Sequence, residues 1–343
     1  MPDGHVTSVG QSYDAARLRV GILGIGTVLV ALWVGAPTGA TDAVAGALTP
    51  APRIVAGAVS ALLLGIVASV LLLPLDVAGG VLIERRLRPV RLSGWARSYA
   101  IGVVGWLAML AVGGALIGAS LSAGRLWWLV ASVLAALGIV IAHRLVDLAS
   151  TTELEELAPS ELAMLGPKLE ALGLVAPKLA WAPGEPTLSG GFVGDTLALS
   201  AGCRALSGTD ELACLVAREI GHRQLHHQRT GIIVASLWAA LAPPLAVLVV
   251  APDRSSAASV VAAVAFASST WAWIGLLVLP SLGRRQVLAA DRFVVERGVD
   301  PLLVRATLEL LAQRNHVDRA RSALVERIFH PVPSLERRLE ALP

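Results

Sequence analysis

The chain has 343 residues, of which 55% are hydrophobic and only 15% are charged, and its mean hydropathy is +0.70. A soluble domain cannot bury that much apolar surface, so the composition excludes a purely soluble protein and indicates one that spans a membrane. The net charge of +3 comes from arginines beside apolar segments. It does not come from a basic stripe interleaved with aromatic residues, which argues against a nucleic-acid partner.

Six apolar segments recur along the chain, each close to the length of about 20 residues that crosses a bilayer. Cytoplasmic loops of membrane proteins are rich in arginine and lysine, and the loop 84–97 carries five arginines. This bias predicts six transmembrane helices in the plasma membrane, with both termini on the cytoplasmic side. The Pro243-Pro244 pair is compatible with a break or with a kink in the fifth helix. The predicted helices are 19–36, 54–76, 98–120, 126–147, 231–251 and 257–280.

The polar segments divide the chain further. Residues 1–147 hold the first four predicted helices, and residues 231–280 hold the last two. The polar pieces 148–230 and 284–343 are predicted to form one small cytoplasmic module together. Its two cysteines lie outside any Cys-x-x-Cys pair and are expected to be free and buried. Membrane lipid is an expected partner of the apolar helices.

The first piece of the module alternates between helix and strand patterns. Residues 152–173 are polar and favour helix but are interrupted by Pro159 and Pro167, which predicts two short helices. Residues 178–182 and 191–200 alternate as strands do. The prolines and glycines between these two segments predict a turn or a hairpin.

A central helix follows these strands. Ser207 or Thr209 is expected to cap its first turn, and the helix is expected to continue through His226 and His227 towards the fifth apolar segment. In the second piece of the module, residues 284–301 predict another helix, and the chain closes with a proline-marked turn and a short charged helix.

The central helix contains the motif Arg218-Glu219-Ile220-Gly221-His222, which differs at one position from His-Glu-x-x-His. In that zinc-protease pattern, two histidines bind the metal from one helical face and the glutamate serves as general base. Arginine keeps its proton in a protein. A guanidinium about 4 Å from a zinc ion is repelled by roughly 8 kcal/mol at an effective dielectric near 20. Arg218 therefore puts a positive charge where the pattern has a metal ligand.

Five segments, in this order along the chain, resemble the integral-membrane zinc metalloproteases that include the CAAX prenyl endopeptidases and the HtpX-type proteases. The resemblance implies an α-helical polytopic membrane protein with a small α+β, zincin-like module on the cytoplasmic side. The segments are LPLDVAGGVLIERRLRPVRLSGW (73–95), GFVGDTLALSAG (191–202), DELACLVAREIGH (210–222), AADRF (289–293) and HPVPSLERRLEAL (330–342).

The resemblance also implies positions for the metal ligands. In this family, zinc is bound by the two histidines of the central helix and by a glutamate four residues before an aspartate. The matching positions hold Arg218, His222 and Val287, so two of the three ligands are replaced.

Other site positions follow from the same resemblance. Glu219 keeps the position of the general base, and Asp291 and His330 are expected beside the cleft. The strand 191–200 is expected to form the edge of the cleft. Its candidate edge residues are Phe192, Thr196 and Leu197.

The replaced ligands predict a pseudoprotease that needs no cofactor, a catalytically inactive homologue acting as a binding, regulatory or structural subunit of a membrane assembly. Its partner would be another membrane protein, or a peptide segment that adds to the edge strand. Arg218 is then expected to form an ion pair with Glu219 or, preferably, with Asp291, because either carboxylate would otherwise be buried alone.

Two alternatives stay open from the sequence. An active zinc endopeptidase would hold its metal with Glu219, His222 and His226, which share one helical face at spacings of i, i+3 and i+7. Alternatively, the transmembrane helices would enclose a chamber that handles a lipid or a small molecule. The Pro243-Pro244 pair is compatible with such a chamber.

Overall fold

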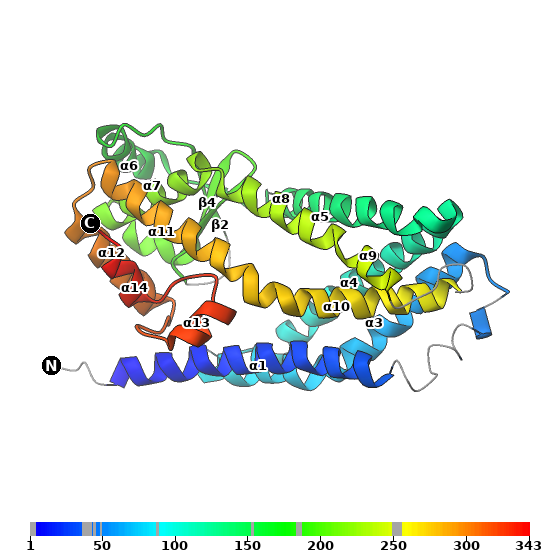
Figure 1. Cartoon of the computed structure of the whole chain (residues 1–343). Coiled ribbons are helices and arrows are strands. Elements are labelled where there is room, and N and C mark those ends of the chain that lie inside the picture. Colours follow the sequence, from blue (N-terminus) through cyan, green and yellow to red (C-terminus); the bar gives the residue numbers. More distant parts are fainter. Residues whose placement is uncertain are drawn as a thin grey trace. The chain divides into compact units, whose positions relative to one another are not determined.

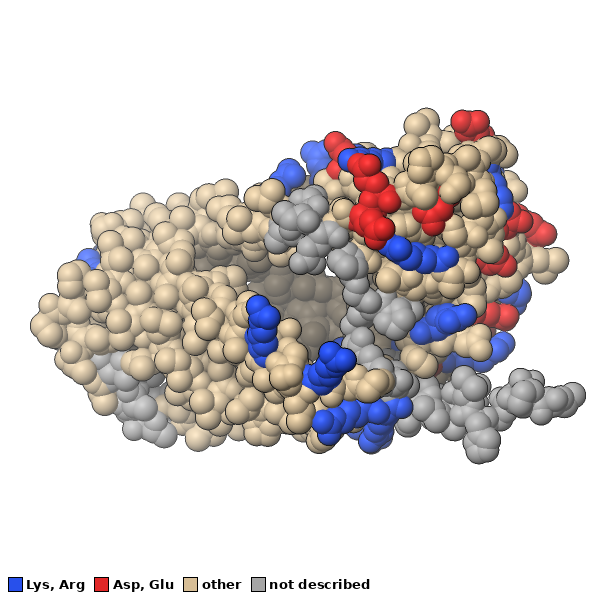
Figure 2. Space-filling model, turned by 180° about the vertical axis from the view of Figure 1, so that it is seen from behind, with Lys and Arg blue, Asp and Glu red and all other residues tan. Residues whose placement is uncertain are grey.

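A computed structural model describes residues 5–35, 50–86, 89–151, 154–182, 187–248 and 256–343, together with positions 43 and 46–48. The chain divides into two compact units (Figure 1). Charged side chains gather over the unit that contains the sheet, whereas the long apolar helices present a mostly uncharged surface (Figure 2). We call the units the helical unit, Ala15–Ile139 and Val234–Gly275, and the module unit, Met1–Asp14, Val140–Ile233 and Leu276–Pro343.

Long apolar helices build the helical unit. Each predicted apolar segment coincides with one of them, except the fifth, which is shared by α8 and α9. The elements that lie wholly or partly in this unit are α1 (His5–Gly35), α3 (Arg53–Val77), η2 (Ala78–Ile83), η3 (Glu84–Arg86), α4 (Leu92–Ser120), η4 (Leu121–Leu126), α5 (Trp127–Thr151), α8 (His227–Ala240), α9 (Ala242–Val247) and α10 (Ala257–Val278).

Among the described residues, five stretches are long and apolar enough to cross a membrane. One of them, Leu92–Leu148, has 57 residues and contains both α4 and α5. The two helices meet at a break where Gly124 has a φ of 59°. The chain is therefore a helical polytopic membrane protein, as its composition predicted.

Helices α3 and α4 pack so closely that their contact requires glycine. A Cβ atom added to Gly57 would lie 2.2 Å from the carbonyl oxygen of Gly114. A Cβ atom added to Gly114 would lie 2.3 Å from the carbonyl oxygen of Gly57. Small residues let membrane helices approach closely and gain van der Waals contact, so this pair anchors the helical unit.

The fifth apolar segment is broken at its proline pair, as one of the two alternatives predicted. Helix α8 ends at Ala240, and α9 begins at Ala242 with Pro243 and Pro244 in its first turn, where the missing N–H groups cost no hydrogen bond. The indole N–H of Trp271 donates to the carbonyl oxygen of Trp238 at 2.9 Å, and the two rings stack with centroids 4.4 Å apart. These contacts hold α10 against the end of α8.

The module unit contains a four-stranded sheet in the order β1-β2-β4-β3. Strands β2 and β4 are parallel, whereas β1 pairs with β2 and β3 pairs with β4 in antiparallel fashion. The strands are β1 (Glu155–Glu156), β2 (Lys178–Ala182), β3 (Gly190–Val193) and β4 (Thr196–Ser200).

This sheet corrects two predictions from the sequence. The segment 191–200 is a hairpin of two strands, because Gly194 with a φ of 60° begins a two-residue turn. Strand β2 pairs with β4 and not with β3, so the hairpin alternative between β2 and the next strand was wrong. The turn alternative stays a prediction, because residues 183–186 lie outside the described ranges. Thr196 and Leu197 accordingly lie on the inner strand β4, and only Phe192 of the predicted edge residues lies on the edge strand β3.

The prediction of two short helices in 152–173 was also wrong, with residues 152–153 outside the described part. One helix, α6 (Pro159–Ala171), runs through Pro167. Pro159 stands at its first position, and the Glu161 carboxylate accepts the Ala158 N–H at 2.8 Å. An interior proline costs about 3 kcal/mol of helix propensity. Burial of leucines on both sides of Pro167 offsets this cost, because tertiary packing overrides propensity.

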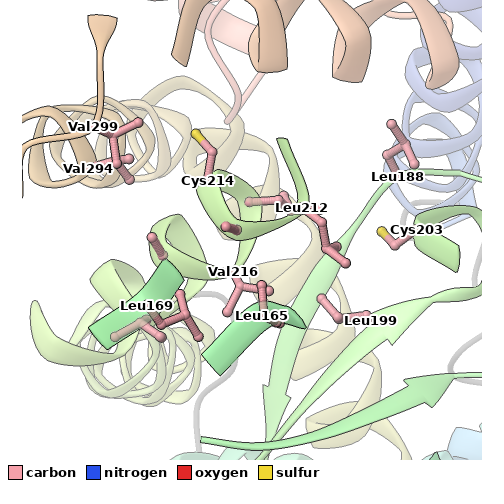
Figure 3. Packing of buried hydrophobic residues seen from close by; sticks show 14 of the residues in the cluster. Leu165, Leu169, Leu188, Leu199, Cys203, Leu212, Cys214, Val216, Val294 and Val299 are labelled. Carbon is pink, nitrogen blue, oxygen red and sulfur yellow. The ribbon is translucent and has the colours of Figure 1, made fainter. Parts of the chain in front are cut away.

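A single apolar core lies between the sheet and the helices of the module unit. Figure 3 shows leucines of α6, Leu199 of β4, Val216 of α7 and Val294 of α11 converging there. Thr209 caps α7 as predicted, with its side-chain oxygen accepting the Leu212 N–H at 3.2 Å. The remaining elements are η5 (Ala201–Leu206), α7 (Asp210–Gln224), α11 (Pro280–Glu296), α12 (Pro301–Arg314), α13 (Ala323–Phe329) and α14 (Leu335–Glu340).

Candidate active-site cleft

Arg218 lies on α7, and its guanidinium sits between two carboxylates. Its Nε donates to Oδ1 of Asp291 at 2.9 Å, and its Nη1 donates to Oε1 of Glu219 at 2.7 Å. The packing of α11 against α7 brings Asp291 within reach of this arginine. The predicted ion pair between Arg218 and Asp291 is confirmed, and Glu219 shares the same guanidinium.

A second arginine, Arg338 of α14, binds the same aspartate. Its Nε donates to Oδ2 of Asp291 at 2.8 Å, and its Nη2 donates to Oδ1 at 2.8 Å, which is the bidentate geometry that arginine forms with carboxylates. Both oxygens of Asp291 are therefore engaged, and the residue is only 2% exposed. Sequence reasoning missed Arg338, because Arg337 beside it gives the same signal and nothing in the pattern shows which one turns inward.

Glu219, at the position of the general base, is 8% exposed. Burial raises the pKa of Glu219, and the neighbouring Arg218 opposes that rise. One oxygen of the Glu219 carboxylate already accepts a hydrogen bond from the Arg218 guanidinium. That oxygen is therefore less available to accept a proton from water. Glu219 thus keeps the position of the general base, but its carboxylate is buried and paired with an arginine.

The histidines of the motif region are arranged differently from the prediction. Helix α7 ends at Gln224, and His226 adopts a φ of 56° in the connection to α8, so it does not share a helical face with Glu219 and His222. Instead, Nδ1 of His222 lies 2.8 Å from Nδ1 of His227. Burial and the nearby Arg218 lower the pKa of His222 to about 3, so this imidazole is neutral at physiological pH.

The third ligand position, Val287, is buried on α11, one helical turn before Asp291. A zinc site needs three deprotonated or neutral nitrogen, sulfur or oxygen ligands around an open position. The three positions supply one imidazole, one aliphatic side chain and one permanent cation. Within the described ranges, no group of three or more His, Cys, Asp or Glu side chains is arranged to hold a metal. The residues present therefore do not fit the zinc site of the resembled family.

Two cavities lie along β3, and Glu219 lines both of them. One of about 360 Å³ extends from Leu188 and Gly190 past Arg218 to the C-terminal segment, where His330 is among its lining residues. The other, of about 420 Å³, is lined by Phe192, His222 and His227. A cleft that follows an edge strand is the arrangement that accepts an extended chain.

The backbone of His330 takes part in a network of hydrogen bonds at this cleft. Its carbonyl oxygen accepts a hydrogen bond from Nη1 of Arg284 at 2.8 Å, and the same nitrogen donates to the carbonyl oxygen of Glu326 at 2.8 Å. The Glu326 carboxylate in turn accepts the Ser334 N–H at 3.2 Å. These bonds tie the C-terminal segment to α11, which holds Arg338 beside Asp291.

Comparison with known proteins identifies the family. Residues 139–343, more than half of the chain, match the profile of peptidase family M48. The chain belongs to peptidase family M48. Its fold is similar to the crystal structure of S. mikatae Ste24p, with a TM-score of 0.65 and 17% sequence identity over 82% of this chain and 74% of that one. No curated protein sequence matches the chain.

Membership of the M48 family confirms the resemblance seen in the sequence, that of a membrane zinc metalloprotease. The matched residues 139–343 include the central helix and both changed ligand positions, Arg218 and Val287. In this member of the family, an arginine–carboxylate network therefore occupies the region where the family binds its metal.

Proposed function

We propose that this chain is a catalytically inactive M48 homologue that acts as a binding, regulatory or structural subunit of a membrane assembly. One observation carries the proposal, namely the Arg218 guanidinium held by Asp291 and Glu219 at the position of a metal-binding imidazole. Arginine is permanently charged and cannot donate an electron pair to a metal.

The charges of the ion-pair network also oppose the binding of a metal ion. Arg218 and Arg338 together balance the charges of Glu219 and Asp291, so the cluster is neutral without a metal. A zinc ion entering here meets two guanidinium groups, and each of them repels it in a partly buried site. Val287 supplies no replacement ligand.

The cleft supports a binding role. Strand β3 lies at the edge of the sheet with Phe192 beside the cavity, and strand addition needs only backbone groups and side-chain pockets. The expected occupant is a peptide segment or part of another membrane protein, while lipid surrounds the apolar helices. The arginines in 84–97 favour the plasma membrane with the module unit and both termini on the cytoplasmic side.

Zinc content and peptidase activity test this function together. Elemental mass spectrometry on protein purified without chelator or nickel resin is expected to give a zinc ratio near zero. Peptide cleavage by the native chain is expected to equal that of the Glu219→Gln variant. The double variant Arg218→His with Val287→Glu restores the family's ligand types, and we expect it to bind more zinc than the native chain. A native ratio near one, or chelator-sensitive cleavage lost in Glu219→Gln, would overturn the proposal.

The second candidate is an active zinc endopeptidase with a variant site. The observation that favours it is the pair of imidazoles, His222 and His227, lining one cavity with Glu219. This candidate predicts that His227→Ala removes bound zinc and activity together. Handling of a lipid or small molecule by the helical unit stays a prediction from the sequence.

A further inference from the structure

Three of the stretches that are long enough to cross a membrane meet at one end of the helical unit. Nη1 of Arg17 on α1 lies 3.5 Å from Oε1 of Glu84, and a Cβ atom added to Gly79 of η2 would lie 3.4 Å from Cγ1 of Val20. The start of α1 and the connection from α3 to α4 therefore lie at the same membrane face, at the depth of the lipid headgroups. Two of the stretches begin there and one ends there, at Ala15, Leu92 and Arg86.

Five exposed arginines gather at this level. Among the described residues, none of the five forms an ion pair or a hydrogen bond. Glu84 is already paired with Arg17, and Asp76, the other acidic residue nearby, lies beside Tyr99. We call these five residues the arginine patch: Arg19, Arg85, Arg86, Arg91 and Arg97.

The other end of α3 shows a different arrangement. There the guanidinium of Arg53 donates from Nη1 to the carbonyl oxygen of Leu121 at 3.3 Å. The protein thus supplies a partner for this arginine but supplies none for the arginine patch. An excess of arginine at a membrane border directs insertion of the chain, but that role does not require unpaired arginines from two separate elements to lie together.

Apolar and aromatic side chains flank the arginine patch. Leu82 and Leu92 are 58% and 54% exposed. Trp95 packs so closely on η2 that a Cβ atom added to Gly80 would lie 2.3 Å from its indole nitrogen, and its ring stacks on that of Tyr99 with centroids 5.1 Å apart. Tryptophan and tyrosine are enriched where headgroups meet acyl chains. The arginine patch therefore borders the hydrocarbon region of the membrane.

The charge of the arginine patch selects among the molecules found at this depth. Guanidinium groups bind phosphate oxygens through parallel hydrogen bonds. Each arginine near a membrane surface strengthens the binding of anionic lipid by about fivefold. A zwitterionic lipid carries a cation beside its phosphate, which the arginines repel. The expected occupant is therefore a phospholipid with a net negative charge.

We propose that the arginine patch is a binding site for an anionic glycerophospholipid, whose phosphate lies among the arginines and whose acyl chain lies along Leu82 and Leu92. Because Arg19 belongs to α1 and the other four arginines to the connection between α3 and α4, the bound lipid links these two elements. The site lies wholly in the helical unit. It is independent of zinc, of the cleft and of the proposed function of the module unit.

Native mass spectrometry of the full-length chain in detergent counts bound lipid directly. The probes are dioleoylphosphatidylglycerol and dioleoylphosphatidylcholine, and we expect the native chain to bind the first tens of times more tightly. Arg85→Gln combined with Arg86→Gln is expected to reduce this preference about 25-fold. The matched control is Arg144→Gln combined with Arg285→Gln, which removes the same charge from exposed positions outside the arginine patch and should bind as the native chain does. Equal binding of the two lipids by the native chain, or equal losses in both double variants, would overturn the proposal.

Two further measurements separate the lipid site from other roles of the same charges. Arg85→Lys combined with Arg86→Lys keeps the insertion signal, and we expect it to retain the lipid preference within about threefold. A loss as large as that of the glutamine pair contradicts selection by charge. Inorganic phosphate lacks acyl chains, so an equal concentration of it is expected to leave the phosphatidylglycerol bound. Complete displacement by inorganic phosphate refutes a lipid as the occupant.

Discussion

Substitution of Arg218 by Met removes the guanidinium while keeping an unbranched side chain. Asp291 retains both hydrogen bonds from Arg338, so the loss falls mainly on Glu219, which is 8% exposed. A buried carboxylate without a cation takes up a proton instead of staying charged. At one pKa unit per 1.36 kcal/mol and an ordinary glutamate pKa near 4.3, protonation costs about 4 kcal/mol at pH 7 and about 1 kcal/mol at pH 5.

The pH dependence of this cost has a definite sign. Burial raises the pKa of Glu219 in the native chain, and loss of Arg218 removes the interaction that opposes the rise. A group whose folded-state pKa is raised contributes stability below its unfolded pKa and loses it as the pH increases. Arg218→Met is therefore expected to destabilise the module unit more at pH 7 than at pH 5.

Hydrogen exchange of the α7 amides measures this local stability without requiring the whole membrane protein to unfold reversibly. Relative to the native chain at the same pH, the variant is expected to exchange several hundredfold faster at pH 7 and about fivefold faster at pH 5. Adding Glu219→Gln should restore most of the protection, because the neutral amide needs no cation. An increase below tenfold at pH 7, or the same increase at both pH values, would refute the reasoning.

Three further substitutions or treatments probe the rest of the chain. Gly114→Ala is expected to cost about 1–3 kcal/mol in detergent unfolding, whereas Gly113→Ala, with open space around its Cβ, should leave stability unchanged. Burial raises the pKa of Glu326, but hydrogen bonds from Ser334 and Arg337 outweigh it, so the pKa lies below its ordinary value. Glu326 therefore stabilises the C-terminal segment above its unfolded pKa of about 4.3 and loses that effect as the pH falls. Glu326→Gln should abolish this pH dependence in hydrogen exchange. Burial raises the pKa of Cys203, and that of Cys214 to about 11, so neither thiol should react with iodoacetamide at pH 7.5 before denaturation.

The helices of the helical unit could be predicted because their signal is local and strong. Each segment predicted from the sequence has about the length that crosses a bilayer, and the Pro243-Pro244 pair coincides with the break after α8. The sequence does not show how α4 and α5 are joined, because the break at Gly124 lies in a short connection that stays helical on both sides.

The module unit could be predicted only in outline. The strand pattern of 191–200 conceals a two-residue turn, because the hairpin keeps its alternation through Gly194 and Asp195. The end of α7 was also missed. His226 takes a positive φ there, and a histidine, unlike a glycine or an asparagine, does not indicate such a conformation in the sequence. Because the helix ends there, His226 does not lie with the other residues of the predicted metal set, and His227 contacts His222 instead.

Only part of the ion-pair network around Asp291 could be predicted from the sequence. The family resemblance placed Asp291 beside Arg218, and a buried arginine next to a buried carboxylate has to be paired with it, so the two together predicted the Arg218–Asp291 pair. It could not predict Arg338, which comes from 47 residues further along the chain and engages both oxygens of the same aspartate. Because of Arg338, Asp291 remains neutralised even when Arg218 is replaced. A single Arg218→His reversion would thus recover one imidazole and leave the cluster stable, yet it would still lack the third ligand at Val287. The two ligand changes therefore have to be reversed together before metal binding can return.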